Sequence, residues 1–371
     1  MDLGFLAPAY AASGPVATAY LDTTSAVEGA AAKIAARWRA RREELAAQGA
    51  DEATLDAMAE AAGRDHGDGA GQVLVGAGGG LLLDGRLPAP PRRETATWGP
   101  LPDVLPMVSV LADAVPYVLV VANRAGADIT AYGDQGDAAG ERHVHGGTFD
   151  IRKVKPGDWA AKKYQQRAEN LWQTNAKSVA EQVAGLATSV RARVIVAAGD
   201  VRALAYLRES LPPPAREILR EVDEGGRAAG ASAASLEEHV RRLVAEAAVR
   251  DTMTVLDEFE QERGQRDRAV EGLAHTVAAL RRAQVQTVVA GDELAGEALL
   301  YIGSEPMQIA LSDADLADLG ADEAVAAPAG PAILRAAVAT GADVVFVPGG
   351  PTRLVGGVGA LLRYADAATP A

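Results

Sequence analysis

IRKVKPGDWAAKKYQQRAENLWQTNAKSVAEQVAGLATSV, residues 151–190, is the stretch around which the rest of the chain can be interpreted. A Pro-Gly turn opens onto a long amphipathic helix, whose apolar stripe recurs every three or four residues and is interrupted at Asn175. The first turns carry Lys and Arg, although Asp and Glu suit the positive end of a helix dipole. Residues 141–167 hold seven basic and three acidic residues, about +4 in a chain of net charge −14. We therefore predict that these cations meet an external anion.

Composition limits the classes of protein to which the chain can belong. A length of 371 residues suits two or three domains. The absence of cysteine excludes disulfides, thiol nucleophiles and Cys-ligated metals. An acidic residue stands where a secretion signal has cations, and no run of roughly 20 apolar residues occurs. We therefore expect a cytoplasmic protein without a membrane partner. The acidic total opposes nonspecific coating of nucleic acid, so we expect no DNA partner, although a local basic loop can still dock on RNA.

Periodicity predicts an α/β fold in three domains. The first domain, residues 1–114, is predicted as a divergent α/β domain with a strand at 17–22, helices at 25–48, 51–63 and 101–114, a hairpin at 72–83, and a linker or edge strand at 86–100. The second, residues 115–230, is predicted with a hairpin at 117–132, the helix above, a strand at 193–198 and a helix at 201–210, which implies partly parallel pairing.

The third predicted domain covers residues 231–371. Ser235 is expected to cap a helix that runs through Phe259, and a second helix should follow Gly264 and reach Arg282. The remaining expected elements are strands at 286–290, 299–303, 343–347 and 361–364, and a helix at 331–340.

Three stretches resemble archaeal and eukaryotic class 1 peptide release factors. GGVGALLRY, residues 356–364, is similar to the closing motif of that family's third domain, which reads close to GGIGGILRY. LDEFEQERGQRDRAVEGLAHTVAALRRAQVQTVVA, residues 256–290, and the hairpin YVLVVANRAGADITAYG also resemble family segments. The resemblance covers residues 116–367. It implies a three-domain architecture of the release factor and pelota type, with a mixed sheet and packed helices in both the middle and the C-terminal domain.

The same resemblance bears on activity. Release factors carry a Gly-Gly-Gln tip in the middle domain, and placing Tyr164 at the family's aromatic position puts Gly157, Asp158 and Trp159 at that triplet. The glutamine that orients the hydrolytic water is absent, which implies a protein that is not a release enzyme and has no catalytic residue. A bacterial branch with this pattern includes the hibernation factor Balon and its mycobacterial relatives. That branch implies occupancy of the ribosomal A site, a middle-domain loop at the peptidyl transferase centre, and elongation factor Tu as a further partner.

The predicted RNA contacts combine cations for phosphates with planar groups for unpaired bases. They are Arg152, Lys153, Lys155, Gly157, Asp158, Trp159, Lys162, Lys163 and Arg167, together with His143 and His145. The alternative is a solvated helix face with core aromatics. The two histidines would share one side of a strand and have metal-ligand spacing, but no third ligand is evident, so we predict no metal site.

Two glycine-rich stretches could imitate phosphate loops. In VLVGAGGGLLL the third glycine of GxGxxG would fall on Leu81 and no helix follows, so a hairpin turn is predicted and no cofactor is expected. Gly356, Gly357 and Gly359 are predicted to allow close packing or a positive φ, and Arg363 and Tyr364 to be structural.

The function predicted from these features is a ribosome-binding hibernation or stress factor that fills the A site without hydrolysing peptidyl-tRNA. The alternative is an enzyme that cleaves tRNA or peptidyl-tRNA on stalled ribosomes, for which Asp158, His143 and His145 are the candidate bases. A plain protein-binding scaffold is the third possibility.

Overall fold

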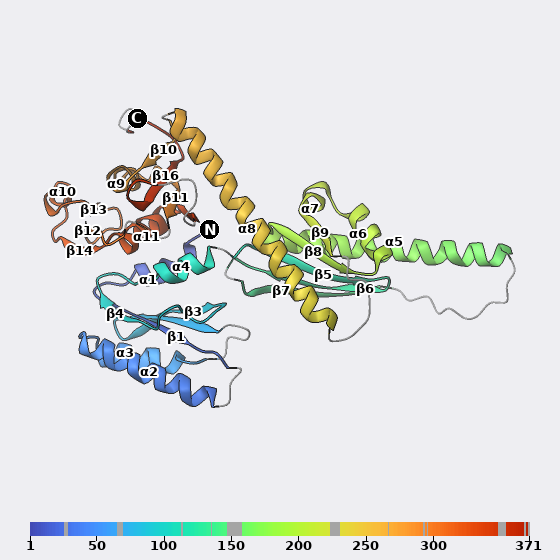
Figure 1. The fold of residues 1–371 in the computed structure, drawn as a ribbon, viewed down its shortest axis with the longest axis horizontal. Helices are drawn as coiled ribbons and strands as arrows, with labels where there is room; N and C mark the ends of the chain where they lie inside the picture. The colour runs from blue at the N-terminus through green and yellow to red at the C-terminus, as the bar shows by residue number, and fades with distance from the viewer. Residues whose placement is uncertain are drawn as a thin grey trace. The chain divides into compact units, whose positions relative to one another are not determined.

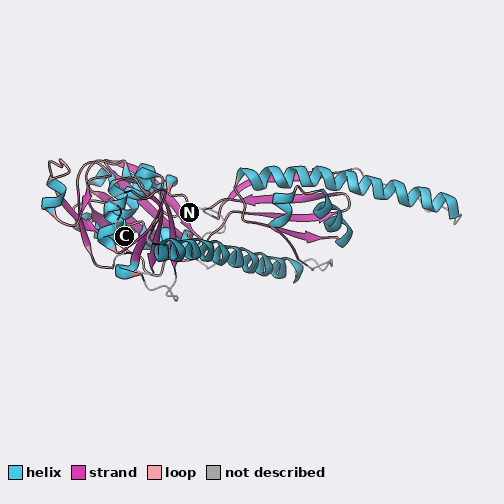
Figure 2. Ribbon diagram, turned by 90° about the horizontal axis from the view of Figure 1, so that it is seen from above, coloured by secondary structure: helices cyan, strands magenta, loops and turns pink. Residues whose placement is uncertain are grey.

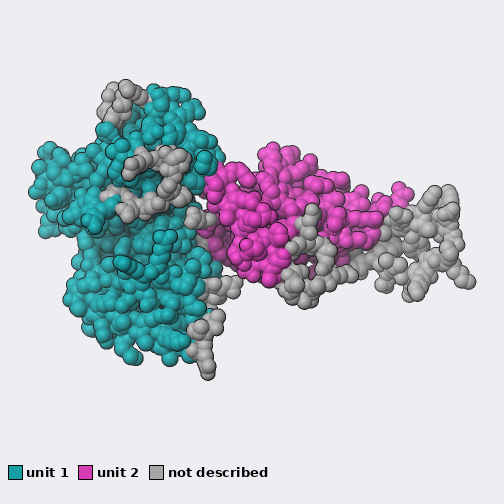
Figure 3. All heavy atoms as spheres, viewed as in Figure 1, with its two compact units in different colours: residues 1–112, 252–371 teal, residues 113–251 magenta. Residues whose placement is uncertain are grey.

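The computed structural model describes residues 1–25, 29–64, 70–112, 114–134, 136–146, 158–222, 231–265, 267–291, 294, 296–347, 354–366 and 369, with side chains of 158–165, 168 and 231–233 outside that description. The chain forms two compact units, which are drawn in different colours in Figure 3. The first unit comprises residues 1–112 and 252–371, and the second residues 113–251. The finer division into three domains stays a prediction.

The second unit is built on a five-stranded sheet in the order β7-β6-β5-β8-β9. Its elements are β5 (Tyr117–Asn123), β6 (Gly126–Tyr132), β7 (Ala138–His145), α5 (Asp158–Ser189), β8 (Val194–Gly199), α6 (Val201–Ser210), α7 (Pro213–Glu217), β9 (Leu219–Val222) and the first part of α8 (Ala231–Gln265). β6 pairs antiparallel with β5 and β7, whereas β8 pairs parallel with β5 and β9. The predicted mixed sheet with partly parallel pairing is thus confirmed.

Alternation along the strands divides the buried side chains of this sheet between two helical layers (Figure 2). On one face Val118, Val120 and Ile129 pack with residues of α5 and α6 such as Val183 and Leu207. On the other face a second cluster forms around the α8 side chains, with members Val194, Val196, Val222, Val240 and Ala247. The sheet is therefore covered by α5 and α6 on one side and by α8 on the other.

Residues 1–112 form an antiparallel sheet in the order β3-β2-β1-β4. The elements are η1 (Gly4–Leu6), α1 (Ala7–Tyr10), β1 (Val16–Asp22), α2 (Ala30–Ala47), α3 (Glu52–Ala61), β2 (Gly71–Ala77), β3 (Gly80–Leu87), β4 (Ala96–Gly99) and α4 (Leu105–Leu111). Side chains of α2 and α3, among them Leu45 and Met58, pack on one face against Leu21 and Leu74. β4 pairs with β1, so the proline-rich stretch ends in an edge strand.

Residues 252–371 form a four-stranded sheet in the order β10-β16-β11-β15 and a three-stranded sheet in the order β13-β12-β14. Besides the end of α8, the elements are β10 (Ala269–Glu271), α9 (Leu273–Arg281), β11 (Val285–Gly291), β12 (Leu299–Ile302), β13 (Ile309–Ala310), α10 (Asp313–Ala317), β14 (Val325–Pro328), α11 (Ala329–Thr340), β15 (Asp343–Val347), η2 (Val355–Gly357) and β16 (Val358–Leu362). β11 pairs parallel with β15 and antiparallel with β16, which confirms the mixed sheet predicted here.

A shared core joins the two ends of the chain in the first unit. Leu3, Leu6 and Met107 belong to the same buried cluster as Val277 and Ile333. The amino-terminal ammonium group also donates a hydrogen bond to the Val344 carbonyl at 3.0 Å. This continuous core explains why residues 1–112 and 252–371 form one compact unit.

Several predicted boundaries are wrong. Ser235 lies inside α8 and does not cap it, because the small helix-forming residues before it extend the helix to Ala231. The helix expected after Gly264 is interrupted by β10, whose three residues pair with β16, and α9 begins only after Gly272 at φ +89°. The last strand ends at Leu362, so Arg363 and Tyr364 follow it. The strand β9 was not predicted, because it has only four residues and two of them are charged.

Within the described ranges, no helix combines the length and apolar character needed to cross a bilayer.

Candidate functional site

The long helix α5 has a packed half and a projecting half. It begins at Asp158, directly after Pro156-Gly157, and its 32 residues correspond to about 48 Å at 1.5 Å per residue. Its C-terminal half is buried on the sheet through residues such as Val179, Val183 and Leu186. Its N-terminal end extends beyond the strands (Figure 1). The helix thus carries its basic N-terminal end away from the core of the second unit.

The predicted RNA-binding residues lie at and before this projecting end. Arg152, Lys153, Lys155 and Gly157 are outside the described residues, as are Pro156 and most of the segment between β7 and α5. The backbone of Asp158, Trp159, Lys162 and Lys163 forms the first turns of α5. Arg167 is exposed on the same helix. Their contact with RNA remains a prediction.

His143 and His145 lie on β7 immediately before that segment. Both are exposed, and strand pairing places His143 opposite Asp128 and His145 opposite Gly126. Val144 between them packs toward the α5 cluster, so both imidazoles lie on the face of the sheet opposite α5. His143 Nδ1 is 2.9 Å from Asp128 Oδ1, and this hydrogen bond and the carboxylate charge raise the pKa of His143.

Asp128 and the two histidines do not make a metal site. Among the described residues, no group of three His, Cys, Asp or Glu side chains could hold a metal ion. The Asp128–His143 pair instead resembles an acid–base arrangement, with a carboxylate orienting one imidazole.

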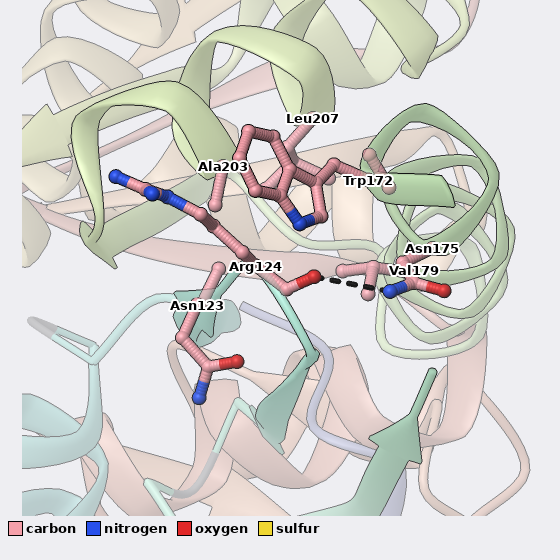
Figure 4. A pocket seen from close by; sticks show the side chains of 9 residues that line it. Asn123, Arg124, Trp172, Asn175, Val179, Ala203 and Leu207 are labelled. Carbon is pink, nitrogen blue, oxygen red and sulfur yellow. Dashed lines mark hydrogen bonds between the residues drawn. The ribbon is translucent and has the colours of Figure 1, made fainter. Parts of the chain in front are cut away.

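At the base of the projecting helix is a cluster that sequence reasoning missed (Figure 4). Arg124, in the β5–β6 turn, places its guanidinium over the Trp172 ring at 4.9 Å. The same guanidinium pairs with Asp200, with Nη2 at 2.9 Å from one carboxylate oxygen and Nε at 3.1 Å from the other. The Asn175 side-chain amide donates to the Arg124 carbonyl at 3.0 Å. The turn, α5 and the start of α6 are thus fixed to one another.

Within this cluster the negative charge of Asp200 neutralises the positive charge of Arg124. Asp200 caps α6 by accepting hydrogen bonds from the backbone N–H groups of Arg202 and Ala203. The bond from Arg124 lowers the pKa of Asp200, which stays ionised and neutralises the arginine. A shallow recess adjoins the cluster and is lined by Ala122, Asn123, Arg124, Trp172, Asn175, Ala176, Val179, Ala203 and Leu207. The cluster supplies rigidity and no free nucleophile. Its sequence signal was the polar Asn175 in an apolar stripe.

The C-terminal glycine motif has a backbone role. Gly356 and Gly357 have φ values of +63° and +70°, in the left-handed region that favours glycine. A Cβ at Gly359 would lie 2.8 Å from the Phe259 ring and 3.0 Å from the Val270 carbonyl oxygen. The strand β16 therefore packs closely against α8 and β10 at this point.

Arg363 and Tyr364 contact the ends of helices. The Arg363 guanidinium donates to the carbonyls of Ala283, Thr340 and Gly341 at 3.0, 2.9 and 2.8 Å. A cation suits these groups because they end α9 and α11, where helix dipoles are negative. The Tyr364 hydroxyl lies 3.5 Å from the Arg282 carbonyl. Both residues join neighbouring turns of the first unit.

Comparison with known proteins found one matching family model and several similar proteins. Residues 116–265 match the model of the bacterial archaeo-eukaryotic release factor family 2. The uncharacterized protein Rv2629 of Mycobacterium tuberculosis strain H37Rv is 29% identical over 366 residues, covering 96% of this chain and 95% of that protein.

Solved structures with similarity include an archaeal translation termination factor, aRF1, at 16% identity and a TM-score of 0.25, covering 94% of this chain and 92% of that one. Dom34 of Saccharomyces cerevisiae has 11% identity and a TM-score of 0.39, covering 74% and 71%. The resemblance to release factors inferred from the sequence is confirmed by the family model over residues 116–265, where it is a resemblance to the bacterial archaeo-eukaryotic release factor family 2.

Proposed function

We propose that this chain is a cytoplasmic, ribosome-associated protein of the release factor and pelota type that occupies the A site without hydrolysing peptidyl-tRNA. In this proposal the segment before α5 reaches the peptidyl transferase centre and contacts its rRNA. The observation that carries it is the long projecting helix, whose start coincides with the Gly157-Asp158-Trp159 triplet that we match to the release factors' Gly-Gly-Gln by placing Tyr164 at the family's aromatic position.

The composition of the projecting end supports RNA binding. Four of the six lysines in the chain fall within residues 153–163, whereas most of the other cations are arginines. Lysine is a compact, mobile point charge suited to phosphates whose positions vary. Trp159 adds a planar group that can stack on an unpaired base. The acidic remainder of the chain is repelled by phosphate, which would restrict RNA contact to this end.

The absence of release activity follows from the chemistry of the tip. A glutamine side chain has an amide that orients a water molecule for attack, and Trp159 has only an indole N–H donor. Asp158 beside it would repel the growing negative charge of a tetrahedral intermediate. We therefore expect the segment to block the site instead of catalysing hydrolysis.

Cosedimentation with 70S ribosomes at increasing salt tests the proposal. We expect binding at about 50 mM salt that falls steeply by about 200 mM, as phosphate contacts are screened. Bound protein should exclude A-site tRNA and release no peptide from peptidyl-tRNA. Failure to cosediment at low salt, in extracts of both growing and starved cells, would contradict the proposal. A pull-down with purified elongation factor Tu examines the further partner separately.

A second candidate function is cleavage of tRNA or peptidyl-tRNA on stalled ribosomes. It is favoured by the Asp128–His143 pair, in which the carboxylate at 2.9 Å could orient the imidazole as a general base. Purified protein would be incubated with stalled complexes, and cleaved tRNA or freed peptide would be measured. Loss of cleavage in His143→Ala or Asp158→Ala, with no loss in the exposed control His275→Ala, would favour the enzyme. No cleavage by the unaltered protein would exclude it.

A further inference from the structure

One surface of the first unit has the opposite charge to the basic end of α5. Residues 283–334 contain nine acidic residues and no Lys, Arg or His, although one residue in ten of the chain is basic. We call residues 296–328 of this stretch the acidic lobe. Seven of the carboxylates belong to it, namely Glu297, Glu305, Asp313, Asp315, Asp318, Asp322 and Glu323. All seven are exposed, and none forms an ion pair with another described residue.

The lobe is a small folded element and not an acidic tail. It consists of the sheet β13-β12-β14 and the short helix α10, labelled in Figure 1. Leu300, Ile302, Ile309 and Leu316 are buried beneath it. The nearby cations lie on its inner side, where Arg335 donates to the carbonyls of Gly303 and Ser304 and Arg281 donates to that of Ile309. These arginines hold the lobe through its backbone, and of the seven carboxylates Glu305 also interacts electrostatically with Arg335.

Apolar side chains are exposed between those carboxylates. Leu299 is 59% exposed, and strand pairing places it beside Pro328 on the outer face of β12 and β14. Leu311 and Leu319 are 44% and 39% exposed and flank α10, which bears acidic residues along its length. Val325 is 42% exposed next to Asp322 and Glu323. Acidic and apolar groups therefore alternate over one small surface.

We propose that the acidic lobe is a docking surface for a segment of another protein in which Lys or Arg alternates with apolar residues. Charge complementarity selects the occupant, because nucleic acid and acidic lipid would be repelled by the seven carboxylates. Basic side chains suit the mixture, since their aliphatic stems can cover Leu299 and Leu319 while their charged ends reach the carboxylates. The proposal goes beyond ribosome binding and does not depend on it.

The test measures binding of a fluorescein-labelled twelve-residue peptide of alternating Lys and Leu to the full chain, by fluorescence anisotropy at low salt. The altered protein carries Asp318→Asn, Asp322→Asn and Glu323→Gln, three exposed positions outside helices and strands. We expect its affinity to fall by about tenfold, since three of seven local charges are removed. A second variant, Leu319→Ser, should weaken binding of the Lys–Leu peptide but not of an all-Lys peptide.

A matched control removes the same total charge elsewhere. Glu43→Gln, Glu60→Gln and Glu181→Gln lie on α2, α3 and α5, where all three side chains are exposed. We expect affinity within twofold of the unaltered chain. Equal weakening by both triple variants would reduce the effect to net charge and overturn the proposal. Analytical ultracentrifugation of the protein alone provides a second check: salt-sensitive dimers abolished by the lobe variant would make a second copy the occupant and overturn it as well.

Discussion

The start of α5 and the C-terminal glycine motif are two regions for which the resemblance to release factors makes a prediction, and they differ in how they meet the fold. At the C-terminal motif, residues 356–364, the glycine and arginine positions that resemble the family motif contact the rest of the first unit. Gly359 lies against Phe259, and Arg363 binds three backbone carbonyls. At residues 158–167, the backbone of the helix extends beyond the strands of the sheet (Figure 1).

This difference separates stability from function. A residue that packs against the core is constrained by folding, so its presence says little about activity. The basic start of α5 extends beyond the strands, so we expect its charge to contribute little to folding and to serve another purpose. Substitutions in the C-terminal glycine motif should therefore change the free energy of unfolding, and substitutions at the start of α5 should change ribosome binding.

The largest expected effect is at Gly359. In Gly359→Val the new side chain would collide with the Phe259 ring, 2.8 Å from the Cβ position, and we expect a loss of about 3 kcal/mol in the free energy of unfolding. Chemical denaturation measures it. The control Gly264→Ala lies in α8 with no atom within 4 Å of its Cβ, and should stabilise by up to about 1 kcal/mol. Equal effects at the two glycines would refute close packing at β16.

Asn175 marks where the packed half of α5 ends. It is 6% exposed, and its amide donates to the Arg124 carbonyl at 3.0 Å. Asn175→Ala should cost about 2 kcal/mol, because a buried hydrogen bond is lost. The exposed neighbour in Gln173→Ala should change stability by less than about 0.5 kcal/mol, measured in the same denaturation experiment. Similar losses of stability in both variants would mean that substitutions along α5 act alike, and Asn175 would then not mark the end of the packed half.

Periodicity predicted much of this fold because burial dominates where strands alternate and helices have a stripe. Helix α6 and strand β15 were predicted with the observed bounds, and the hairpin of β5 and β6 was also predicted. The misses have local causes. β10 is three residues long and forms only through pairing with β16, and Ser235 sits where helix-forming alanines override its capping preference. Such choices depend on tertiary contacts, which a sequence pattern does not contain.

The candidate site was predictable in part. The basic segment and the two histidines are visible as charge and spacing, and the pairing of β6 with β7 then brings His143 to Asp128. The cluster of Arg124, Trp172 and Asp200 was not predictable, since its members are 28 to 76 residues apart and meet only when α5 and α6 pack on the sheet.

A charge reversal at the start of α5 tests the functional side of the comparison. Lys162→Glu with Lys163→Glu takes the charge of residues 141–167 from about +4 to about zero. We expect the affinity for 70S ribosomes to fall by about tenfold at low salt, measured by cosedimentation, with a shallower salt dependence. Stability should change by less than about 0.5 kcal/mol, because this part of the helix projects beyond the sheet.

The matched control for that reversal is Lys33→Glu with Lys177→Glu, which makes the same change in net charge at exposed positions of α2 and the packed half of α5. It should retain at least half of the ribosome affinity. Equal losses in both double variants would assign the effect to net charge, and the projecting end would have no special role.

The smallest expected effect concerns pH and the pair beside the basic segment. The hydrogen bond and charge of Asp128 raise the pKa of His143, so the imidazole stays protonated to a higher pH than usual. The pair's contribution to stability is present below the unfolded pKa and is lost as the pH rises through the folded value.

Protonation of His143 should also affect ribosome binding. The affinity should rise, by less than about threefold, as the pH falls from about 8 to about 6, since His143 gains a charge near phosphate. Asp128→Asn should move the His143 transition, followed by NMR, to lower pH. A transition that stays in place in this variant would show that Asp128 does not control His143.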